Sequence, residues 1–246
     1  MPLSEEFEHQ GAWLFRYRSF VPPALLAGLV AAAAERPGRD AVPGLEPDWV
    51  LAGMGVALIG LLVRAAVVGS AAAGTSGKNR SGQVAATLTT TGLYSVVRHP
   101  LYLGNLLLWL GPAIAAATWW GVVAVALAFG LYYERIMYAE EAFLRRTFGA
   151  DYLAWASTTP AIIPAVSRWR RPALAFSLRT VLRQEYYALF STGLMFVLLE
   201  LATVWLESGR VSLSSAWLGG AVFLFGFAGT LRFLQRYTRV LNVEGR

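Results

Sequence analysis

Two short polar motifs interrupt a chain that is otherwise largely apolar. The first is Arg98-His99-Pro100, which leads directly into an apolar run. Because proline disfavours helical geometry in the preceding residue and suits the first helical position, a helix should begin at about Leu101. The first amides of that helix lack intrahelical partners, and its amino end is partly positive. Arg98 and His99 should therefore lie at the mouth of a pocket suited to an anionic group.

The second motif is the pair Glu140-Glu141, at the end of a later apolar segment. If that segment continues as a helix past the bilayer, Glu141 shares a face with Tyr138, whereas Glu140 falls on an apolar stripe and needs a partner. The apolar segments that adjoin the two motifs follow each other almost directly, so they should form an antiparallel hairpin. The hairpin would bring both glutamates near His99. The alternative is an ordinary interfacial helix whose acids pair with the arginines that follow them.

The composition indicates a polytopic membrane protein. Of the 246 residues, 56% are hydrophobic and 15% are charged, and the mean hydropathy is +0.49. The chain has no cysteine, which excludes disulfides, thiolate metal sites and a cysteine nucleophile, and we expect no metal site. The net charge is +6, but the basic residues lie in loops between apolar runs. Membrane topology explains that pattern better than nucleic-acid binding does.

The elements that must position the motifs are apolar segments of about the length that crosses a bilayer. They are residues 20–34, 49–73, 101–117, 119–137, 186–206 and 213–231. We therefore expect an all-α, polytopic membrane helical bundle of about six transmembrane helices. Three parts follow along the chain. They are residues 1–86 with two spans and a cytoplasmic loop, residues 87–164 with the hairpin and an interfacial helix, and residues 165–246 with a basic interfacial segment and two spans.

Charge distribution predicts the orientation of this bundle. The 21 Lys and Arg residues are concentrated on the side that holds both termini and the Arg98 motif. The exceptions are Arg36, Arg39, Arg210 and the intramembrane Arg64. The positive-inside rule therefore places both termini and the candidate site in the cytoplasm. A charge within a span is costly, so Arg64 is either functional or snorkels toward the surface.

Two features lie beyond the motifs. The segment Arg168–Arg183 carries five arginines and is best explained as an interfacial segment that binds anionic lipid headgroups. Glu200, inside the fifth apolar segment, is either a partner for another polar group or part of a lipid headgroup site.

Together the two motifs resemble a known group of enzymes. The pattern is Gly92-Leu93-Tyr94 and Arg98-His99-Pro100-x-Tyr102-x-Gly104, then Glu140-Glu141-x-x-Leu144-x-x-x-Phe148-Gly149-x-x-Tyr152 and Pro160. It is similar to the integral-membrane methyltransferases of the isoprenylcysteine carboxyl methyltransferase and phospholipid methyltransferase group, over roughly residues 87–164. The resemblance implies S-adenosylmethionine bound at the cytoplasmic ends of these helices, with the first segment and the paired glutamates contributing to its pocket.

The chemistry of that methyl donor agrees with the residue types. The candidates for binding it are Arg98, His99, Pro100, Tyr102, Gly104, Tyr138, Glu140 and Glu141. Arg98, His99 and helix amides could hold its carboxylate, and a glutamate could accept from its ammonium or ribose. Tyr102 and Tyr138 could flank its adenine or sulfonium, and Gly104 permits a close approach to the backbone.

Methyl transfer mainly requires positioning of the reactants and exclusion of water. Arg98 and His99 are the catalytic candidates, and His99 would be the base if an ammonium acceptor had to lose a proton. We expect a lipophilic acceptor, isoprenylcysteine-carboxylate-like or another lipid, that enters from the bilayer.

Three alternatives remain open at this point. They are a phospholipid N-methyltransferase, an NADPH-dependent membrane reductase of the sterol type, and a noncatalytic membrane scaffold or lipid-binding protein. The Glu140-Glu141 pair favours a methyl donor over a nicotinamide. The sequence does not distinguish a carboxylate, an amine or a thiol as the acceptor group.

Overall fold

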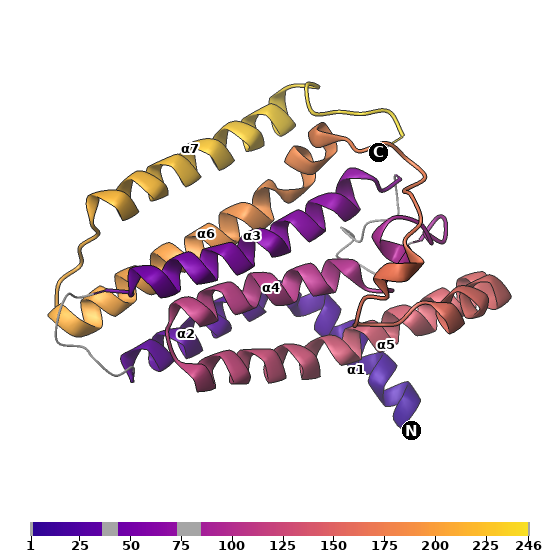
Figure 1. Cartoon of the computed structure of the whole chain (residues 1–246), viewed down its shortest axis with the longest axis horizontal. Helices are drawn as coiled ribbons and strands as arrows, with labels where there is room; N and C mark the ends of the chain where they lie inside the picture. The colour runs from indigo at the N-terminus through magenta and orange to yellow at the C-terminus, as the bar shows by residue number, and fades with distance from the viewer. Residues whose placement is uncertain (1, 36–43, 73–84, 246) are drawn as a thin grey trace.

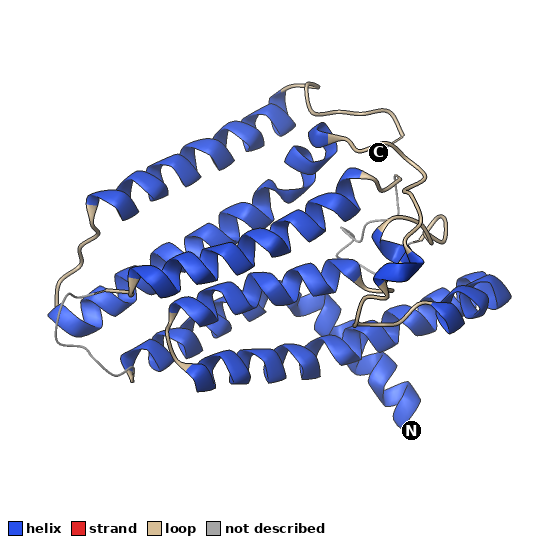
Figure 2. Ribbon diagram, in the orientation of Figure 1, coloured by secondary structure: helices blue, strands red, loops and turns tan. Residues whose placement is uncertain are grey.

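The protein is a bundle of long helices, seen here in a computed structural model that describes residues 2–35, 44–72 and 85–245 (Figures 1 and 2). Its α-helices are α1 (Leu3–Tyr17), α2 (Val21–Ala34), α3 (Pro47–Gly69), α4 (Pro100–Ala115), α5 (Trp119–Thr158), α6 (Leu178–Ser208) and α7 (Ser215–Tyr237). Three short 3-10 helices join them, η1 (Arg18–Phe20), η2 (Leu93–Ser95) and η3 (Val166–Arg168). Within the described ranges the only β-type pairing is an isolated bridge between Gly92 and Arg170. The all-α class is confirmed.

The helices differ in their ability to cross a membrane. By length and composition α3, α5, α6 and α7 can each span, and the bent pair formed by α1 and α2 would add a fifth span if it counts as one. Helix α4 has 16 residues, fewer than the roughly 20 that a full crossing needs. All six expected segments are thus helical, but four or five rather than six have the length and composition of a span. The cytoplasmic location of the termini stays a prediction.

The predicted hairpin is present and is formed by α4 and α5. Helix α4 begins at Pro100, one residue before the expected start, with the non-helical His99 as its cap (φ −120°, ψ 60°). Residues 116–118 then turn the chain, and Ala117 adopts a left-handed conformation there (φ 55°). Helix α5 continues well past its apolar part, interrupted by non-helical geometry at Gly149. The glutamates therefore lie on a helix, as expected.

Helices α3 and α4 approach each other closely at two pairs of glycines. A Cβ at Gly60 would lie 2.8 Å from the Gly104 carbonyl oxygen, and one at Gly104 would lie 3.0 Å from the Gly60 carbonyl oxygen. Seven residues away on each helix, Gly53 and Gly111 face each other in the same way. Small residues at such spacings let helix backbones pack tightly in a membrane. Helix α3 is therefore a rigid support for the start of α4.

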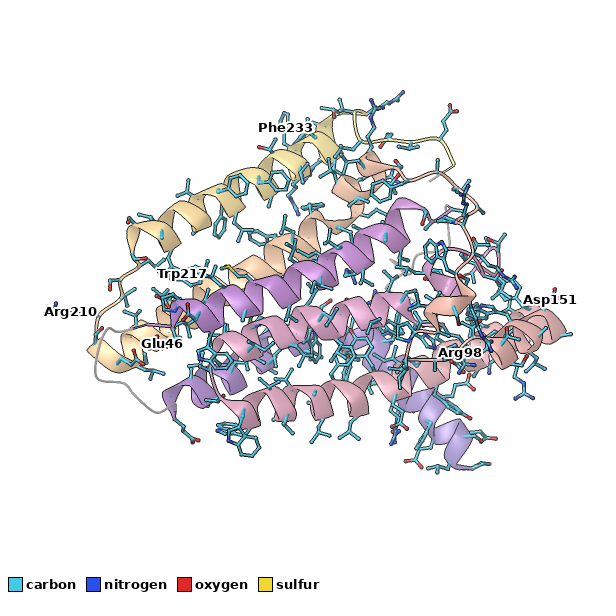
Figure 3. All side chains as sticks on the ribbon, in the orientation of Figure 1. Glu46, Arg98, Asp151, Arg210, Trp217 and Phe233 are labelled. Carbon is cyan, nitrogen blue, oxygen red and sulfur yellow. The ribbon has the colours of Figure 1, made fainter. Side chains whose placement is uncertain are left out.

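The end of the bundle opposite the motifs is fixed by two carboxylates of α6. Glu200 accepts a hydrogen bond from the backbone amide of Leu45 (2.7 Å), and Glu207 accepts one from the amide of Gly44 (2.8 Å). Figure 3 shows Glu46 and Arg210 at this end, far from Arg98. Of the two explanations for Glu200, the structure therefore supports a partner for another polar group.

The C-terminal helices are longer than the apolar segments that predicted them. Helix α6 begins at Leu178 rather than at residue 186, and α7 extends to Tyr237 rather than to residue 231. Part of the predicted basic interfacial segment, including Arg179 and Arg183, is therefore the first turns of α6. Lys78, Arg80, Arg36 and Arg39, which the topology prediction uses, lie outside the described residues.

Candidate active site

Backbone and side-chain hydrogen bonds fix the segment that precedes α4. The amide of Arg98 donates to the carbonyl of Pro160 (2.8 Å), and the amide of Ala165 donates to the carbonyl of Val96 (2.8 Å). The indole of Trp155 donates to the carbonyl of Tyr94 (3.0 Å). The chain that follows α5 thus returns to the entrance of α4. The segment after the second motif therefore holds the first motif in place.

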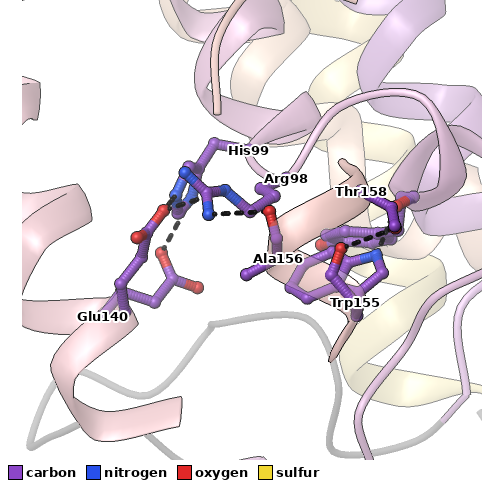
Figure 4. A network of polar contacts seen from close by, with 8 residues as sticks. Arg98, His99, Glu140, Trp155, Ala156 and Thr158 are labelled. Carbon is purple, nitrogen blue, oxygen red and sulfur yellow. Dashed lines mark hydrogen bonds and ion pairs between the residues drawn. The ribbon is translucent and has the colours of Figure 1, made fainter. Parts of the chain in front are cut away.

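His99 contacts both glutamates of α5, and Arg98 contacts Glu141. Figure 4 shows Arg98, His99 and Glu140 side by side. His99 Nε2 lies 2.9 Å from an oxygen of Glu141, and His99 Nδ1 lies 3.6 Å from an oxygen of Glu140. Arg98 Nε lies 3.2 Å from Glu141. The expected proximity of the motifs is confirmed. The alternative, in which the acids pair with the arginines after them, is not what the structure shows, because Arg146 pairs with Glu8 of α1 instead.

The two carboxylates change the protonation of His99. Its side chain is 5% exposed, and burial alone would lower its pKa. Hydrogen bonds and charge interactions with Glu140 and Glu141 outweigh burial and raise the pKa of His99 to about 9. His99 is therefore an imidazolium at neutral pH, with each ring nitrogen facing a carboxylate. The base function that the sequence indicated stays a prediction, and it would require this proton to leave first.

Aromatic rings form an apolar wall beside the charged cluster. The ring of Tyr102, one turn into α4, stacks on the His99 ring at 5.5 Å between centroids. Tyr133 of α5 lies 4.9 Å from the Tyr102 ring and stacks on Phe129. The His99 ring therefore has carboxylates at its nitrogens and an aromatic ring against its face.

A cavity of about 560 Å³ lies at this end of the bundle. Five of the predicted site residues line it, namely Arg98, His99, Pro100, Tyr102 and Glu140. Tyr94, Trp155 and Phe143 complete this part of the wall. Glu141 lies behind the wall and holds Arg98 and His99. The volume is within the range of roughly 300–1,000 Å³ that is typical of small-molecule sites.

Two predicted site residues lie elsewhere. The ring of Tyr138 packs edge-on against Phe7 of α1 (5.9 Å) and does not line the cavity, because α1 covers that face of α5. Gly104 does permit a close approach to the backbone, but Gly60 and the side chain of Arg64 occupy the space. Gly104 therefore packs α4 against α3, and contact of this residue with a ligand stays a prediction.

A second polar network, which the sequence did not predict as a unit, lies at another part of the cavity wall. Arg64 binds Glu185 of α6 through two hydrogen bonds of 2.6 and 3.0 Å, and its Nη1 donates to Asn105. Asn105 Nδ2 in turn lies 3.0 Å from the hydroxyl of Tyr133. Four helices are linked by this network. The sequence signal for this network is Asn105, a polar residue in the otherwise apolar helix α4, one residue after Gly104 of the motif.

The expected absence of a metal site stays a prediction. Among the residues that the structure describes, no group of three or more His, Asp or Glu side chains is arranged to hold a metal ion. The two glutamates beside His99 lie at opposite ring nitrogens, so they do not converge on one point.

Part of the chain is similar in sequence to known proteins. Residues 49–151 match the phospholipid methyltransferase family. The chain is 29% identical to protein-S-isoprenylcysteine O-methyltransferase B of Arabidopsis thaliana over 129 residues, which are 51% of this chain and 65% of that protein. It is 39% identical to a cobalt-zinc-cadmium resistance protein of Cupriavidus metallidurans over 90 residues, 37% of this chain and 41% of that protein. No solved structure gives a significant match.

These matches confirm the resemblance to the isoprenylcysteine carboxyl methyltransferase and phospholipid methyltransferase group. The chain spans between 41% and 65% of the length of the relatives named above. The matched residues 49–151 include α3, α4 and the glutamates of α5, but not α6 or α7.

Proposed function

We propose that the chain is an integral-membrane methyltransferase that uses S-adenosylmethionine and acts on a lipophilic acceptor. The proposal rests on one observation: beside a single cavity, Arg98 pairs with Glu141, and His99 lies between Glu140 and Glu141. These four residues lie in the part of the chain that matches a methyltransferase family. An isoprenylcysteine-like carboxylate is the first acceptor class to test, and a phospholipid amine is the second.

The residues around the cavity fit the methyl donor. The donor carries a carboxylate, an ammonium, a sulfonium and an adenosine, and when bound it supplies an electrophilic methyl group. Arg98 offers hydrogen-bond donors to its carboxylate, the imidazolium of His99 adds a positive charge nearby, and Glu140 offers a negative partner for its ammonium or ribose. Tyr102 and Trp155 offer aromatic surface for the adenine or sulfonium. The cavity thus provides both charges and aromatic faces.

The residues of this chain position the reactants rather than move protons. His99 is held between two carboxylates and is protonated at neutral pH, so it orients and donates hydrogen bonds. Arg98 is braced by Glu141 and by the carbonyl of Ala156. A carboxylate or thiolate acceptor needs no base, and such acceptors match a site of this kind best. We infer that the cavity faces the cytoplasm, where the donor is available, from the distribution of basic residues.

Binding of the donor tests the proposal directly. S-adenosylmethionine and NADPH are titrated calorimetrically into the purified protein in nanodiscs. We expect S-adenosylmethionine to bind, and Glu141→Gln to weaken it at least about tenfold, because Arg98 and His99 lose the carboxylate that orients them. Glu134→Gln on the same helix is the matched control, since Glu134 pairs with the neighbouring Arg135 and its side chain is 59% exposed.

The other outcomes identify the competing functions. Binding of NADPH alone would replace the proposal with a membrane reductase. Binding of neither ligand would favour a noncatalytic scaffold. Equal loss in Glu134→Gln and Glu141→Gln would mean that the cluster of glutamates does not form the donor site.

A further inference from the structure

One wall of the cavity is built by helices that the donor site does not use. Beyond the motifs, the cavity is lined by Arg64 of α3, by Gln184 and Tyr187 of α6 and by Arg232 and Gln235 of α7. Helices α6 and α7 lie outside the residues that match the methyltransferase family. The cavity therefore extends from the motifs to helices that the family match does not cover.

The charges around the cavity are unbalanced. Its arginines are Arg18, Arg64, Arg98 and Arg232, and Glu140 is its one lining carboxylate among the described residues. Glu141 and Glu185, just behind the wall, neutralise Arg98 and Arg64. Because the donor itself has more positive than negative groups, its binding increases the positive excess. A second ligand with a negative charge would restore the balance.

Arg232 is the cation of this wall that has no carboxylate partner. In the ranges that the structure describes, Arg64 and Arg98 each form an ion pair, whereas none involves Arg232. Arg232 and Tyr187 are exposed and line the cavity at the same time. The cavity is therefore open to its surroundings between α6 and α7. Helix α7 lies at the edge of the bundle (Figure 1), and it has the length and composition of a membrane span. An opening beside such a helix would face the lipid.

The lining residues Gln184 and Tyr187 of α6 and Arg232 and Gln235 of α7 form what we call the α6–α7 wall. We propose that the α6–α7 wall binds the polar end of the acceptor. It takes the carboxylate or phosphate of an amphiphile whose apolar chain leaves through the opening, and Arg232 is the residue that selects the negative charge. A guanidinium suits both anions, because its planar donors can form two parallel hydrogen bonds to either. The inference rests on the proposed methyltransferase function, but it concerns a different part of the cavity.

Three probes with the same 18-carbon chain test the inference. Oleate, oleoyl lysophosphatidate and the uncharged monoolein are titrated into the full-length protein in detergent, and binding is followed by native mass spectrometry. We expect at least one anionic probe to bind about tenfold or more tightly than monoolein. Arg232→Gln should remove that preference while leaving the binding of monoolein and of S-adenosylmethionine unchanged.

Arg236→Gln is the matched control. Arg236 lies one turn further along α7, over the ring of Tyr237 and outside the cavity lining, and the substitution removes the same charge. Equal binding of all three probes, or an equal loss in both variants, would overturn the inference. So would a loss of S-adenosylmethionine affinity in Arg232→Gln, which would assign this arginine to the donor's carboxylate.

Two further outcomes separate the possible causes of failure. If inorganic phosphate displaces the lysophosphatidate at equal concentration, the site recognises a soluble anion, and the acceptor assignment is overturned. If the wild-type protein binds the anionic probes through Arg232 but does not bind S-adenosylmethionine, the methyltransferase proposal fails while the anion site remains.

Discussion

His99 is the residue in which the two motifs act as one unit. Each of its ring nitrogens faces a carboxylate from α5, its own backbone caps α4, and its ring carries Tyr102. A neutral imidazole can donate from one nitrogen only, whereas the imidazolium can donate to both glutamates. Protonation of this single residue therefore joins the start of α4 to the middle of α5.

That linkage predicts a loss of stability at high pH. The pKa of His99 is about 9 in the folded protein, above its usual value of 6.5. Its contribution is therefore fully present below about pH 6.5 and is lost as the pH rises through 9. The loss should be on the order of 3 kcal/mol for a shift of this size. Thermal unfolding in detergent at pH 6.5 and pH 9.5 measures it.

The variant His99→Gln provides the comparison. It should be less stable than the wild type at pH 6.5 and show a smaller decrease between the two pH values. If wild type and variant lost the same stability, the pH dependence would arise from other groups. His9, on α1, is the only other histidine in the chain, so His9→Gln is a suitable control.

At the scale of elements, the close packing of α3 on α4 determines where the motif lies. A Cβ at Gly53 would overlap the carbonyl oxygen of Gly111, whereas nothing lies within 4 Å of a Cβ at Gly55. Gly53→Ala should therefore destabilise the protein by roughly 1–3 kcal/mol relative to Gly55→Ala, because the backbones must separate. Both variants change helix propensity equally. Unfolding in detergent compares them, and equal stability would show that the helices adjust without cost.

Local signals in the sequence predicted the elements of the site well. Pro100 fixed the start of α4 to within one residue, and the short connection after it predicted the hairpin that brings the glutamates to His99. No signal in the sequence indicated that Tyr138 would lie away from the cavity, because its environment depends on α1, which packs on α5 from more than a hundred residues away. Helix periodicity indicates which residues share a face, but it does not indicate which neighbour covers that face.

At the scale of the whole molecule, the pairing of distant helices could not be predicted. Arg64 and Glu185 are 121 residues apart, and nothing local in the sequence relates them. The sequence left Arg64 as either functional or snorkelling, whereas the structure gives it a bidentate partner and a place in the cavity wall. This ion pair joins the part of the chain that matches the methyltransferase family to the C-terminal helices outside it.

The ion pair should therefore be necessary for α6 to remain docked on α3. The two side chains are only 18% and 8% exposed, so removing one partner leaves a poorly solvated charge. Arg64→Met and Glu185→Met should each reduce the free energy of unfolding by about 3–5 kcal/mol, and the double variant should recover most of that loss. Unfolding of the four proteins in detergent gives the coupling energy.

The exposed pair Arg146 and Glu8 is the control for this double-mutant cycle. It has a similar N···O distance, 2.6 Å, but solvent reaches both side chains, and the same cycle there should give no measurable coupling. If the buried cycle also gave none, α6 would be held by apolar packing alone. A large coupling would instead mean that the α6–α7 wall is fixed to the donor site through Arg64, because Arg64 is also linked to Asn105 and Tyr133. An acceptor that binds this wall would then be placed at a defined distance from the donor by a charge inside the membrane.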